Sequence, residues 1–312
     1  MVRLLLFVAC LLAAAPAFAQ TPEYPDGPPG WIQADTTGCK LWNATPKHGE
    51  TVTWSGACVD GFAEGMGVQQ WFLEGKPAGH YEGSMHSGKL SGFGEYIWPS
   101  GSRYEGQWLD NSQHGHGVYI YSDGRRYDGE WRNGHRNGRG VLTTSAGNRF
   151  DGEWRDDNLH GRATATWSSG NCYDGEWRDD RPSGRGIYTW ANGDRYEGEF
   201  SDGKLTGHGV YTPANRDLGS AGKAARETGN FPISYDGDFV DGEFHGIGIM
   251  LFSNGDWYKG EWRNDRPNGR GTMQLVDGRV FAGTWRGGCM RRGRYIASLG
   301  ASEAECRARL SR

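Results

Sequence analysis

The chain has 312 residues, of which 52 are glycine and 14 tryptophan, with a net charge of −4 and a pI near 6.1. This balance excludes a chain built to neutralise nucleic-acid phosphates, which requires a strong basic excess, so we expect no nucleic-acid partner. Large aromatic residues alternate with the glycines in a fixed register, which excludes a disordered low-complexity chain.

The first residues have the features of an export signal. Arg3 supplies a positive charge, residues 4–15 an apolar stretch, and residues 17–19 an Ala-Phe-Ala cleavage motif. We therefore expect residues 1–19 to be a signal peptide, cleaved near Ala19, and the remainder to be periplasmic or secreted; the form of the signal is bacterial. The alternatives are a retained anchor, for which the apolar stretch is short, and lipid attachment at Cys10, which lies too early in that stretch.

Residues 20–50 are rich in proline and glycine and are predicted to be a largely irregular lead-in. The exported chain would keep five cysteines, none of them at metal or redox spacing. They are Cys39, Cys58, Cys172, Cys289 and Cys306. Disulfides persist outside the cytosol. Pairs Cys39–Cys58 and Cys289–Cys306 would tie down the two ends of the chain and are expected, although the sequence leaves other pairings open. Cys172 is then either a free thiol or part of an intermolecular bridge.

A tripeptide of an aromatic residue, a mostly acidic residue and glycine returns every 23 residues. It begins at Tyr81, Tyr104, Tyr127, Phe150, Tyr173 and Tyr196, and again, after a longer gap, at Tyr235, Tyr258 and Phe281. A constant period over this length indicates one small unit stacked on copies of itself. Such a chain has no single globular core, so its function should lie on an extended surface.

Each repeat reads as a β-hairpin. In the repeat that starts at Tyr104, residues 104–108 alternate between large and polar, which predicts a strand, and residues 115–121 predict a second. Residues 110–113 have turn chemistry, and Asp123-Gly124 predicts a tight hairpin turn of the favoured two-residue type. The predicted fold is all-β: an elongated single-layer antiparallel sheet of stacked hairpins.

One face of this sheet should carry rows of aromatic rings, and the other rows of acidic and basic residues. Glycines on the ring face, including the recurrent Gly-x-Gly of the second strand, would leave hollows in which the rings lie. A nucleotide-binding reading of Gly-x-Gly fails because no strand-to-helix transition follows. On the other face, acidic rows such as Glu130 and basic rows such as Arg139 favour cross-strand pairs.

The stretch from Tyr127 to Val141, with Tyr-Asp-Gly-Glu-Trp, a polar turn and Gly-Arg-Gly-Val, resembles the MORN (membrane occupation and recognition nexus) repeat family. The resemblance covers about residues 51–293. It departs from the family pattern at Cys58, which replaces a Trp, at Ala163, which replaces a Gly, and in the last unit, which lacks its Gly-x-Gly strand.

Two segments stand apart from the period. Residues 213–232 read as a surface loop inserted between two repeats. Residues 294–312 are predicted to form a helical cap, because Ser302 and Glu305 have the spacing of a capping box.

The repeat argues against catalysis. Nearly every Glu, Asp or His has copies 23 residues away in an equivalent setting, whereas a catalytic group needs a unique environment. The histidines lack a third ligand at metal spacing. We therefore predict no enzyme activity, no catalytic residue, no metal and no cofactor.

The function predicted is a non-catalytic scaffold that binds an unidentified protein partner. The candidate contact residues are Trp131, Trp154, Trp177, Trp190, Arg125 and Arg126. The alternative for the indoles is that they only stabilise the array. Two other ligand classes stay open: anionic membrane phospholipid, which the resemblance implies, and carbohydrate, which aromatic platforms can bind.

Overall fold

The structure is a computed structural model that describes residues 29–214 and 231–311. The described chain divides into two units, residues 29–168 and residues from 169 onward, and each is treated by itself. The predicted signal peptide, residues 1–19, and most of the predicted insertion at 213–232 lie outside the described residues.

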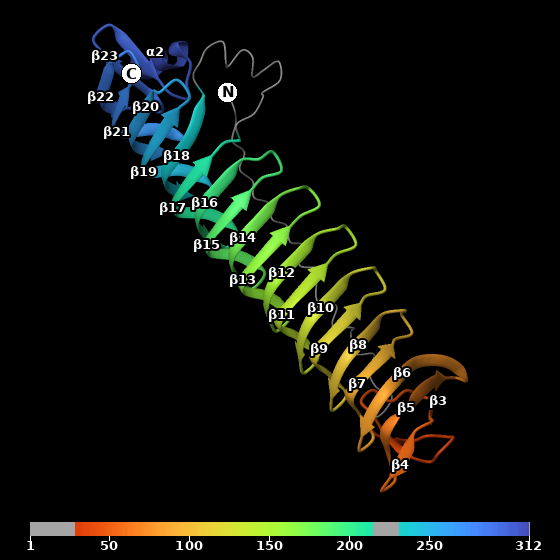
Figure 1. Cartoon of the computed structure of the whole chain (residues 1–312). Helices are drawn as coiled ribbons and strands as arrows, with labels where there is room; N and C mark the ends of the chain where they lie inside the picture. Colours follow the sequence, from red (N-terminus) through yellow and green to blue (C-terminus); the bar gives the residue numbers. More distant parts are fainter. Residues whose placement is uncertain (1–28, 215–230, 312) are drawn as a thin grey trace. The chain divides into compact units, whose positions relative to one another are not determined.

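In the first unit, strands β5 to β13 each pair antiparallel with the next strand along the chain, so that successive hairpins extend an open sheet (Figure 1). Strand β3 pairs with the free side of β5. The strands are β1 (Gly30–Gln33), β2 (Lys40–Asn43), β3 (Glu50–Trp54), β4 (Ala57–Val59), β5 (Phe62–Leu73), β6 (Lys76–His86), β7 (Lys89–Ile97), β8 (Arg103–Leu109), β9 (Ser112–Ile120), β10 (Arg126–Arg132), β11 (His135–Thr143), β12 (Arg149–Arg155) and β13 (Asn158–Thr166).

The second unit repeats the pattern from β14 to β22, again with each strand antiparallel to the next. Its strands are β14 (Cys172–Arg178), β15 (Arg181–Thr189), β16 (Arg195–Ser201), β17 (Lys204–Thr212), β18 (Pro232–Val240), β19 (Glu243–Phe252), β20 (Trp257–Arg263), β21 (Arg266–Gln274), β22 (Val280–Trp285), β23 (Cys289–Arg292) and β24 (Tyr295–Ser298). The predicted antiparallel sheet of stacked hairpins is confirmed.

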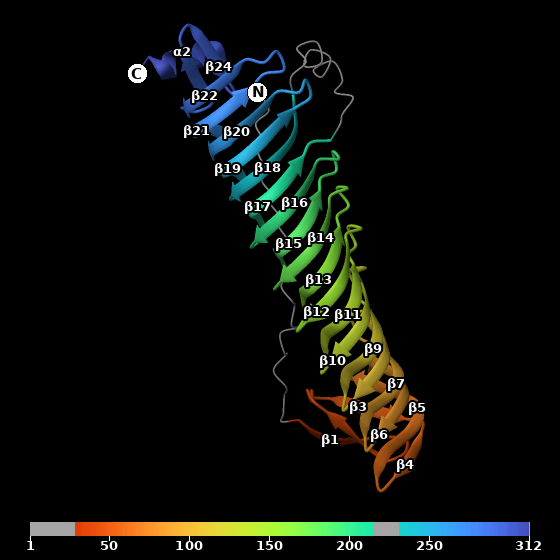
Figure 2. The same cartoon turned by 60° about the vertical axis from the view of Figure 1, so that its left-hand side comes forward.

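Within the predicted lead-in, residues 20–50, β1 and β2 form a short hairpin, of which β1 is labelled in Figure 2. The reason is aromatic packing. Trp31 meets Trp42 and Phe62 edge to face, with ring centroids 5.2 and 4.9 Å apart. The disulfide Cys39–Cys58 joins this hairpin to the region of β4. The first repeat therefore has a cover made from residues that carry no repeat signal.

The aromatic rings pack on one face of each sheet, which we call the ring face. Tyr127 and Trp131 lie on it with 0% and 6% of their surface exposed, and their rings meet at 5.1 Å and 90°. The Tyr127 hydroxyl donates to the carbonyl oxygen of Glu130 at 3.1 Å. Burying each such ring contributes about 2–3 kcal/mol, and the hydroxyl stays satisfied.

Two glycines seat each tyrosine ring. A Cβ added to Gly140 would lie 2.2 Å from the Tyr127 hydroxyl oxygen, and one added to Gly129 would lie 2.4 Å from the Cα of Gly140. The ring therefore lies flat against the backbone of two paired strands. This confirms the seating role for the second glycine of Gly-x-Gly.

The first glycine of Gly-x-Gly has a different role from the one predicted. Gly138 has a φ of +84°, and the β10–β11 register shifts between Gly129 and Trp131, which marks a β-bulge. The bulge frees the amide of Arg139, which donates to a carboxylate oxygen of Glu130 at 2.9 Å. Glycine is needed here for its left-handed backbone and not for the ring.

The tight two-residue turns are at the other end of each hairpin from the one predicted. Asn133 and Gly134 both have positive φ, 51° and 82°, and link β10 directly to β11 as a type I′ turn does. Asp123 and Gly124 lie instead in a longer loop, where only Gly124 has a positive φ and Tyr121 and Arg125 close the loop by a backbone hydrogen bond. The Asp-Gly pair alone does not fix the loop length.

The face opposite the rings, which we call the charged face, carries charge pairs both within a strand and across neighbouring strands. Asp128 contacts Arg126 on its own strand at 2.8 Å and His116 across the strand pair at 3.4 Å. These side chains are well exposed, so each pair contributes only about 0–1 kcal/mol.

The C-terminal end of the second unit is closed by the β23–β24 hairpin and helix α2 (Glu303–Leu310). Ser302 and Glu305 form the predicted capping box. The disulfide Cys289–Cys306 joins β23 to the helix. Cys172 is a free, partly exposed cysteine.

A candidate interaction surface on the ring face

Four rings on the ring face of the first unit are partly exposed, in contrast to the buried tyrosines and indoles. They form a continuous series, which we call the ring ladder: Tyr96, Trp98, Tyr119 and Tyr121. Successive ring centroids are 4.7, 5.1 and 4.3 Å apart. The ladder runs across β7 and β9 and into the two loops that follow these strands.

The position of the ladder explains its exposure. Its members come from the second strand of two hairpins, beyond the glycines that seat the buried tyrosines. In the next repeat the equivalent positions are Leu142 and Thr144, so the series of rings ends there. The result is a bounded aromatic surface on two neighbouring repeats.

Tyr96 begins the ladder close to the N-terminal strands. Its hydroxyl passes over Gly79, where an added Cβ would lie 2.2 Å from it. Burial, with a smaller contribution from the carboxylate of Glu50, raises the pKa of Tyr96 to about 12. The phenol is therefore neutral at physiological pH, and the ladder presents uncharged rings.

Two arginines flank the far end of the ladder. The Cζ atom of Arg125 lies 4.4 Å from the Tyr121 ring centroid, and Arg136 lies 4.4 Å from that of Trp154. Each is also held by a carboxylate: Arg125 by Asp123 at 2.7 Å, and Arg136 by Asp157 at 3.2 Å. Both guanidinium charges are thus locally neutralised.

Arg136 takes a position that is apolar in most other repeats, although the preceding repeat has Gln113 there. The equivalent residues include Leu90, Leu159 and Leu205, all buried. Burial opposes ionisation of its partner Asp157, yet contacts from His135 and from the amide and guanidinium of Arg136 hold the pKa of that carboxyl below its usual value. The ion pair is therefore a specific feature of this repeat.

The structure does not bring the six residues of the predicted interaction surface together at one place. Trp131, Trp154 and Trp177 are only 6%, 4% and 3% exposed, and the indole nitrogens of the first two donate to Gly117 and Gly140 carbonyls of the preceding repeat. Because the rings are seated on neighbouring backbone, these three indoles do not offer an accessible aromatic surface.

The other three predicted residues lie apart as well. Trp190 is partly exposed, in a second group of rings with Tyr188 and Tyr211 in the second unit. Arg125 reaches the ring face beside Tyr121, whereas Arg126 lies on the charged face with Asp128. Neighbouring strand residues point to opposite faces, which separates the two arginines.

The ladder was missed because sequence reasoning chose rings by their recurrence. Trp98 and Tyr121 occupy the outermost ring position of the second strand, and Tyr96 and Tyr119 the one before it. A signal was present: these positions vary between ring, Leu, Met, Ala, Thr and Pro from repeat to repeat, whereas the buried tyrosine position is always Tyr or Phe.

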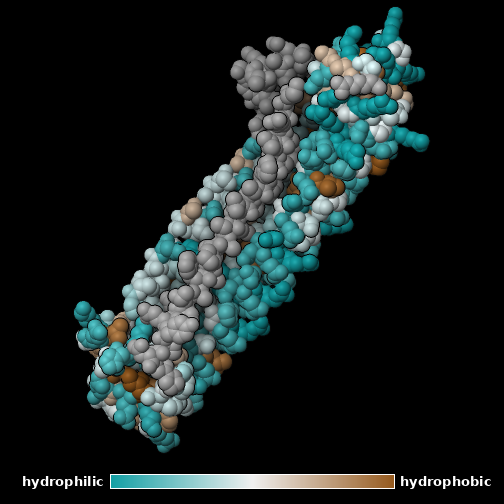
Figure 3. Space-filling view, turned by 180° about the vertical axis from the view of Figure 1, so that it is seen from behind, coloured by the Kyte–Doolittle hydropathy of each residue, from teal (hydrophilic) through white to brown (hydrophobic). Residues whose placement is uncertain are grey.

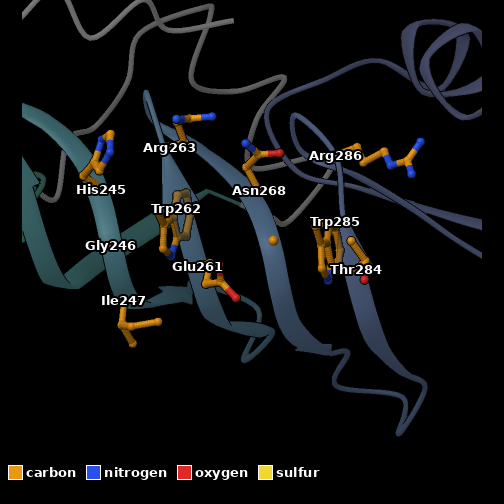
Figure 4. A pocket seen from close by; sticks show the side chains of 11 residues that line it. His245, Gly246, Ile247, Glu261, Trp262, Arg263, Asn268, Thr284, Trp285 and Arg286 are labelled. Carbon is orange, nitrogen blue, oxygen red and sulfur yellow. The ribbon is translucent and has the colours of Figure 1, made fainter. Parts of the chain in front are cut away.

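Hollows of another kind lie beside the bulge glycines. In the second unit, an open hollow of about 610 Å³ lies beside Gly246 and Gly269, with Trp262 and Trp285 forming its wall and Asn268 and His245 at its rim (Figure 4). The first unit has a similar hollow of about 510 Å³ at the equivalent repeat position, beside Gly138. Recurrence identifies these hollows as a consequence of the bulge.

The described residues, 29–214 and 231–311, contain no cluster of three or more His, Cys, Asp or Glu side chains placed to hold a metal ion. Within the same residues, no helix has the length and hydropathy that crossing a bilayer demands. On the face drawn in Figure 3, hydrophilic side chains predominate and hydrophobic ones gather in small groups.

Solved structures with some similarity include the TCP10 domain of Danio rerio CPAP in complex with a STIL peptide, at 14% identity and a TM-score of 0.35, covering 76% of this chain and 99% of that one. The Drosophila melanogaster SAS-4 TCP domain, in complex with a proline-rich motif of Ana2, is 11% identical with a TM-score of 0.29, covering 62% and 84%. The comparison with curated proteins finds no match.

The pattern of the MORN repeat matches eight segments of the chain. They are residues 81–103, 104–125, 127–149, 150–172, 173–195, 196–217, 235–257 and 258–278. These segments account for more than half of the sequence and coincide with the hairpins of both units. The chain therefore belongs to the MORN repeat family.

Proposed function

We propose that this MORN repeat protein is a non-catalytic scaffold that binds a protein partner through the ring ladder. The observation that carries the proposal is the ladder itself: four partly exposed rings in unbroken contact on two neighbouring repeats. Tyr and Trp offer large contact area at low conformational-entropy cost, which is why they concentrate at binding surfaces.

We further propose that the protein works outside the cytosol of a bacterial cell. The two disulfides support this, because such bonds persist in oxidising compartments. The sequence of residues 1–19 supports it independently. A catalytic role is disfavoured because the acidic residues recur in equivalent settings, with Glu130, Glu176 and Glu261 each accepting a hydrogen bond from a bulge amide.

Cross-linking in the native envelope, followed by mass spectrometry, tests the proposal with a matched pair of variants. Trp98→Ala/Tyr121→Ala removes the two outermost rings of the ladder. Phe93→Ala removes a ring that is 58% exposed on the charged face of the same unit. The native chain and Phe93→Ala should capture the same partner, and the double variant should lose it. Capture that is equal in all three chains would overturn the proposal.

Membrane lipid and carbohydrate are the alternative ligand classes, and each has its own test. Anionic phospholipid needs unpaired basic groups, and Arg125 and Arg136 are paired with Asp123 and Asp157. Co-sedimentation with phosphatidylglycerol vesicles at low salt would favour lipid instead. Binding on a glycan array that Trp98→Ala/Tyr121→Ala abolishes would favour carbohydrate.

A further inference from the structure

Three exposed apolar side chains lie on the charged face of the first unit, and we call them the apolar patch. Met66, Phe93 and Leu109 have 67%, 58% and 47% of their surface exposed. Exposed apolar groups that gather in one place mark interaction sites. In later repeats of this unit the same positions are charged: His116, Arg139 and Arg162 take the position of Met66 and Phe93, and Arg132 and Arg155 that of Leu109.

The side chains between the three members are neutral, so no charge interrupts the patch. Met66 on β5 is opposite Ser84 on β6, whose hydroxyl donates to the Met66 sulfur at 2.9 Å. On the next two strands, β7 and β8, Phe93 is opposite Gln107. Leu109 is two residues beyond Gln107 and therefore on the same face. Most later repeats have an acidic residue at the position of Ser84 and Gln107, so the patch belongs to these repeats alone.

A row of three carboxylates runs beside the apolar patch, and we call it the acidic row. Glu82 on β6 is directly opposite Glu95 on β7, and Glu95 is directly opposite Glu105 on β8. Like charges directly opposite each other on neighbouring strands are destabilising. The next two repeats avoid this arrangement, because Val118 and Val141 take the position of Glu95.

The acidic row is only partly neutralised by its surroundings. A guanidinium nitrogen of Arg103 lies 3.5 Å from a carboxylate oxygen of Glu95. Among the residues that the structure describes, Glu82 and Glu105 form no ion pair. By contrast Asp128, which follows Glu105 at the same repeat position, has an arginine of its own strand at 2.8 Å. The row therefore keeps a repulsion that a cationic partner would relieve.

The spacing of the two features favours one shape of partner. Along β7, Phe93 and Glu95 are two residues apart on one face, a distance of about 6.6 Å, so the patch and the row lie side by side. From strand to strand the row advances about 4.8 Å per step. An α-helix advances about 5.4 Å per turn, whereas same-face residues of an extended chain are about 6.8 Å apart. The step of the row therefore fits the turns of a helix better than an extended chain.

We propose that this surface docks a basic amphipathic helix of a protein partner, laid across β5 to β8. Its apolar stripe would cover the apolar patch, as in other recognition of amphipathic helices. Lysines or arginines one turn apart would lie on the acidic row, where they replace repulsion by attraction. The surface is on the opposite face of the sheet from the ring ladder, so the inference goes beyond the proposed function and does not depend on it.

Binding of a designed peptide to the full chain tests the docking. The probe is a fluorescein-labelled peptide of about 18 residues, long enough to form a helix, with leucines at i, i+3, i+4 and i+7 and lysines along one flank of the leucine stripe. The native chain should bind it, and salt should weaken the complex. Glutamate in place of lysine, or the same residues with the leucines scattered, should each weaken binding at least about tenfold. Equal affinity for the three peptides would overturn the proposal.

Matched variants locate the site of binding. Met66→Ala/Phe93→Ala should weaken binding of the lysine peptide at least about tenfold, as loss of central anchors does. Ile247→Ala removes an apolar side chain that is 56% exposed at the position equivalent to Phe93 in the second unit, and it should leave the affinity unchanged. An affinity that is the same in the native chain and in Met66→Ala/Phe93→Ala would exclude the apolar patch.

Glu95→Val separates binding from folding. The substitution installs the residue found at Val118 and Val141 and removes both carboxylate juxtapositions, so the urea midpoint should rise while the affinity for the lysine peptide falls at least about threefold. A loss of binding that accompanies a gain in stability cannot come from misfolding. Asp151→Asn, at a carboxylate already paired with Arg149, is the control and should leave the affinity unchanged. Unaltered affinity in Glu95→Val would contradict the role of the acidic row.

Two further measurements identify other occupants and keep the two surfaces apart. In sedimentation velocity, a native dimer that Phe93→Ala dissociates would show a second copy on the patch and overturn the choice of a helix. Trp98→Ala/Tyr121→Ala should bind the lysine peptide as the native chain does. If no chain binds the peptide while Trp98→Ala/Tyr121→Ala still loses its envelope partner, the scaffold function stands and this inference alone is wrong.

Discussion

The indole nitrogen of Trp131 donates a hydrogen bond to the carbonyl oxygen of Gly117, 3.1 Å away on the last strand of the preceding repeat. The same bond recurs along the chain at 2.9–3.2 Å. Its donors are Trp108, Trp154, Trp262 and Trp285. Each of these five repeats is thereby joined to its neighbour by a satisfied polar contact within the aromatic layer, in addition to the strand pairing.

Trp131→Phe isolates the contribution of this bond. Phe200 and Phe239 occupy the equivalent position in their repeats, so a phenyl ring is compatible with the site. The substitution removes the indole hydrogen bond to the buried Gly117 carbonyl, and we expect a loss of about 1–2 kcal/mol, measured as a lower urea midpoint. Trp98→Phe, at a partly exposed ring, is the control and should change stability by less than about 0.5 kcal/mol. An unchanged midpoint for Trp131→Phe would refute the bond's role.

The tyrosine seat can be tested by a double-mutant cycle that the chain already suggests. Where Phe150 replaces the tyrosine, the seating glycine is replaced by Ala163, so a missing hydroxyl accompanies an added methyl group. Gly140→Ala should cost about 1–3 kcal/mol, because its Cβ would lie 2.2 Å from the Tyr127 hydroxyl oxygen.

Adding Tyr127→Phe to Gly140→Ala should recover part of this loss. Without its hydroxyl bond to Glu130, the ring is free to shift away from the new methyl group. Urea unfolding of the two single variants and the double variant measures the coupling, which should be at least about 0.5 kcal/mol. Strictly additive effects would show that the methyl group and the hydroxyl do not compete for this space.

Two aspartates at the same turn position should respond oppositely to pH. The pKa of Asp157 is lowered, because contacts from His135 and Arg136 outweigh its burial, whereas burial raises the pKa of Asp265 even though it accepts the amide of Phe244. Asp157 therefore contributes stability above its unfolded pKa, near 3.9, and this is lost as the pH falls through its folded value. For Asp265 the contribution is complete below the unfolded pKa and is lost as the pH rises through the folded one.

Asparagine variants separate the two cases while keeping a side-chain oxygen at each turn. Asp157→Asn should destabilise the protein at pH 7, with a difference from the native chain that shrinks toward pH 3. Asp265→Asn should be neutral or stabilising at pH 7 and lose that advantage on acidification. Thermal unfolding between pH 3 and pH 7 checks both signs, and a common direction for the two variants would contradict the assignment.

The C-terminal disulfide should hold the cap of the second unit. Cys289→Ser/Cys306→Ser opens a loop whose ends are 17 residues apart, and a loop of this length contributes about 3 kcal/mol in the chain-entropy model. We expect faster amide hydrogen exchange in helix α2 and in β23. Cys172→Ser, which breaks no disulfide, is the matched control. Exchange rates in α2 that are the same for both variants would show that the helix is held by packing alone.

Different parts of the fold were predictable to different degrees. The period of the Tyr-x-Gly tripeptide predicted the hairpins, their antiparallel order and the burial of Tyr127, because each repeat confirms the alternation of the last. The turn type was wrong at Asp123-Gly124, since loop length depends on where strand pairing stops. The β1–β2 hairpin was missed because its residues belong to no repeat and acquire a partner only through Phe62 and Cys58.

The candidate surface was harder to predict than the fold. From the sequence, Trp131 and Trp98 are both rings on the same face, and nothing local distinguishes them. In the structure, Trp131 lies on the backbone of the preceding repeat and is closed off, whereas Trp98 lies beyond the last seating glycine. The exposure of a ring depends on which backbone and side-chain atoms the neighbouring hairpin places against it, and therefore on how the hairpins pack together.

By itself the sequence determined the repeating unit, the face to which each side chain points and the segments that lie outside the repeats. It could do so because alternation and a constant period can be read directly along the chain. Only the tertiary structure decided which rings stay accessible, which acidic groups hold a bulge amide and how the β1–β2 hairpin is joined to the first repeat. These depend on contacts between residues from different hairpins, whose distances are set by how one strand pair packs against the next.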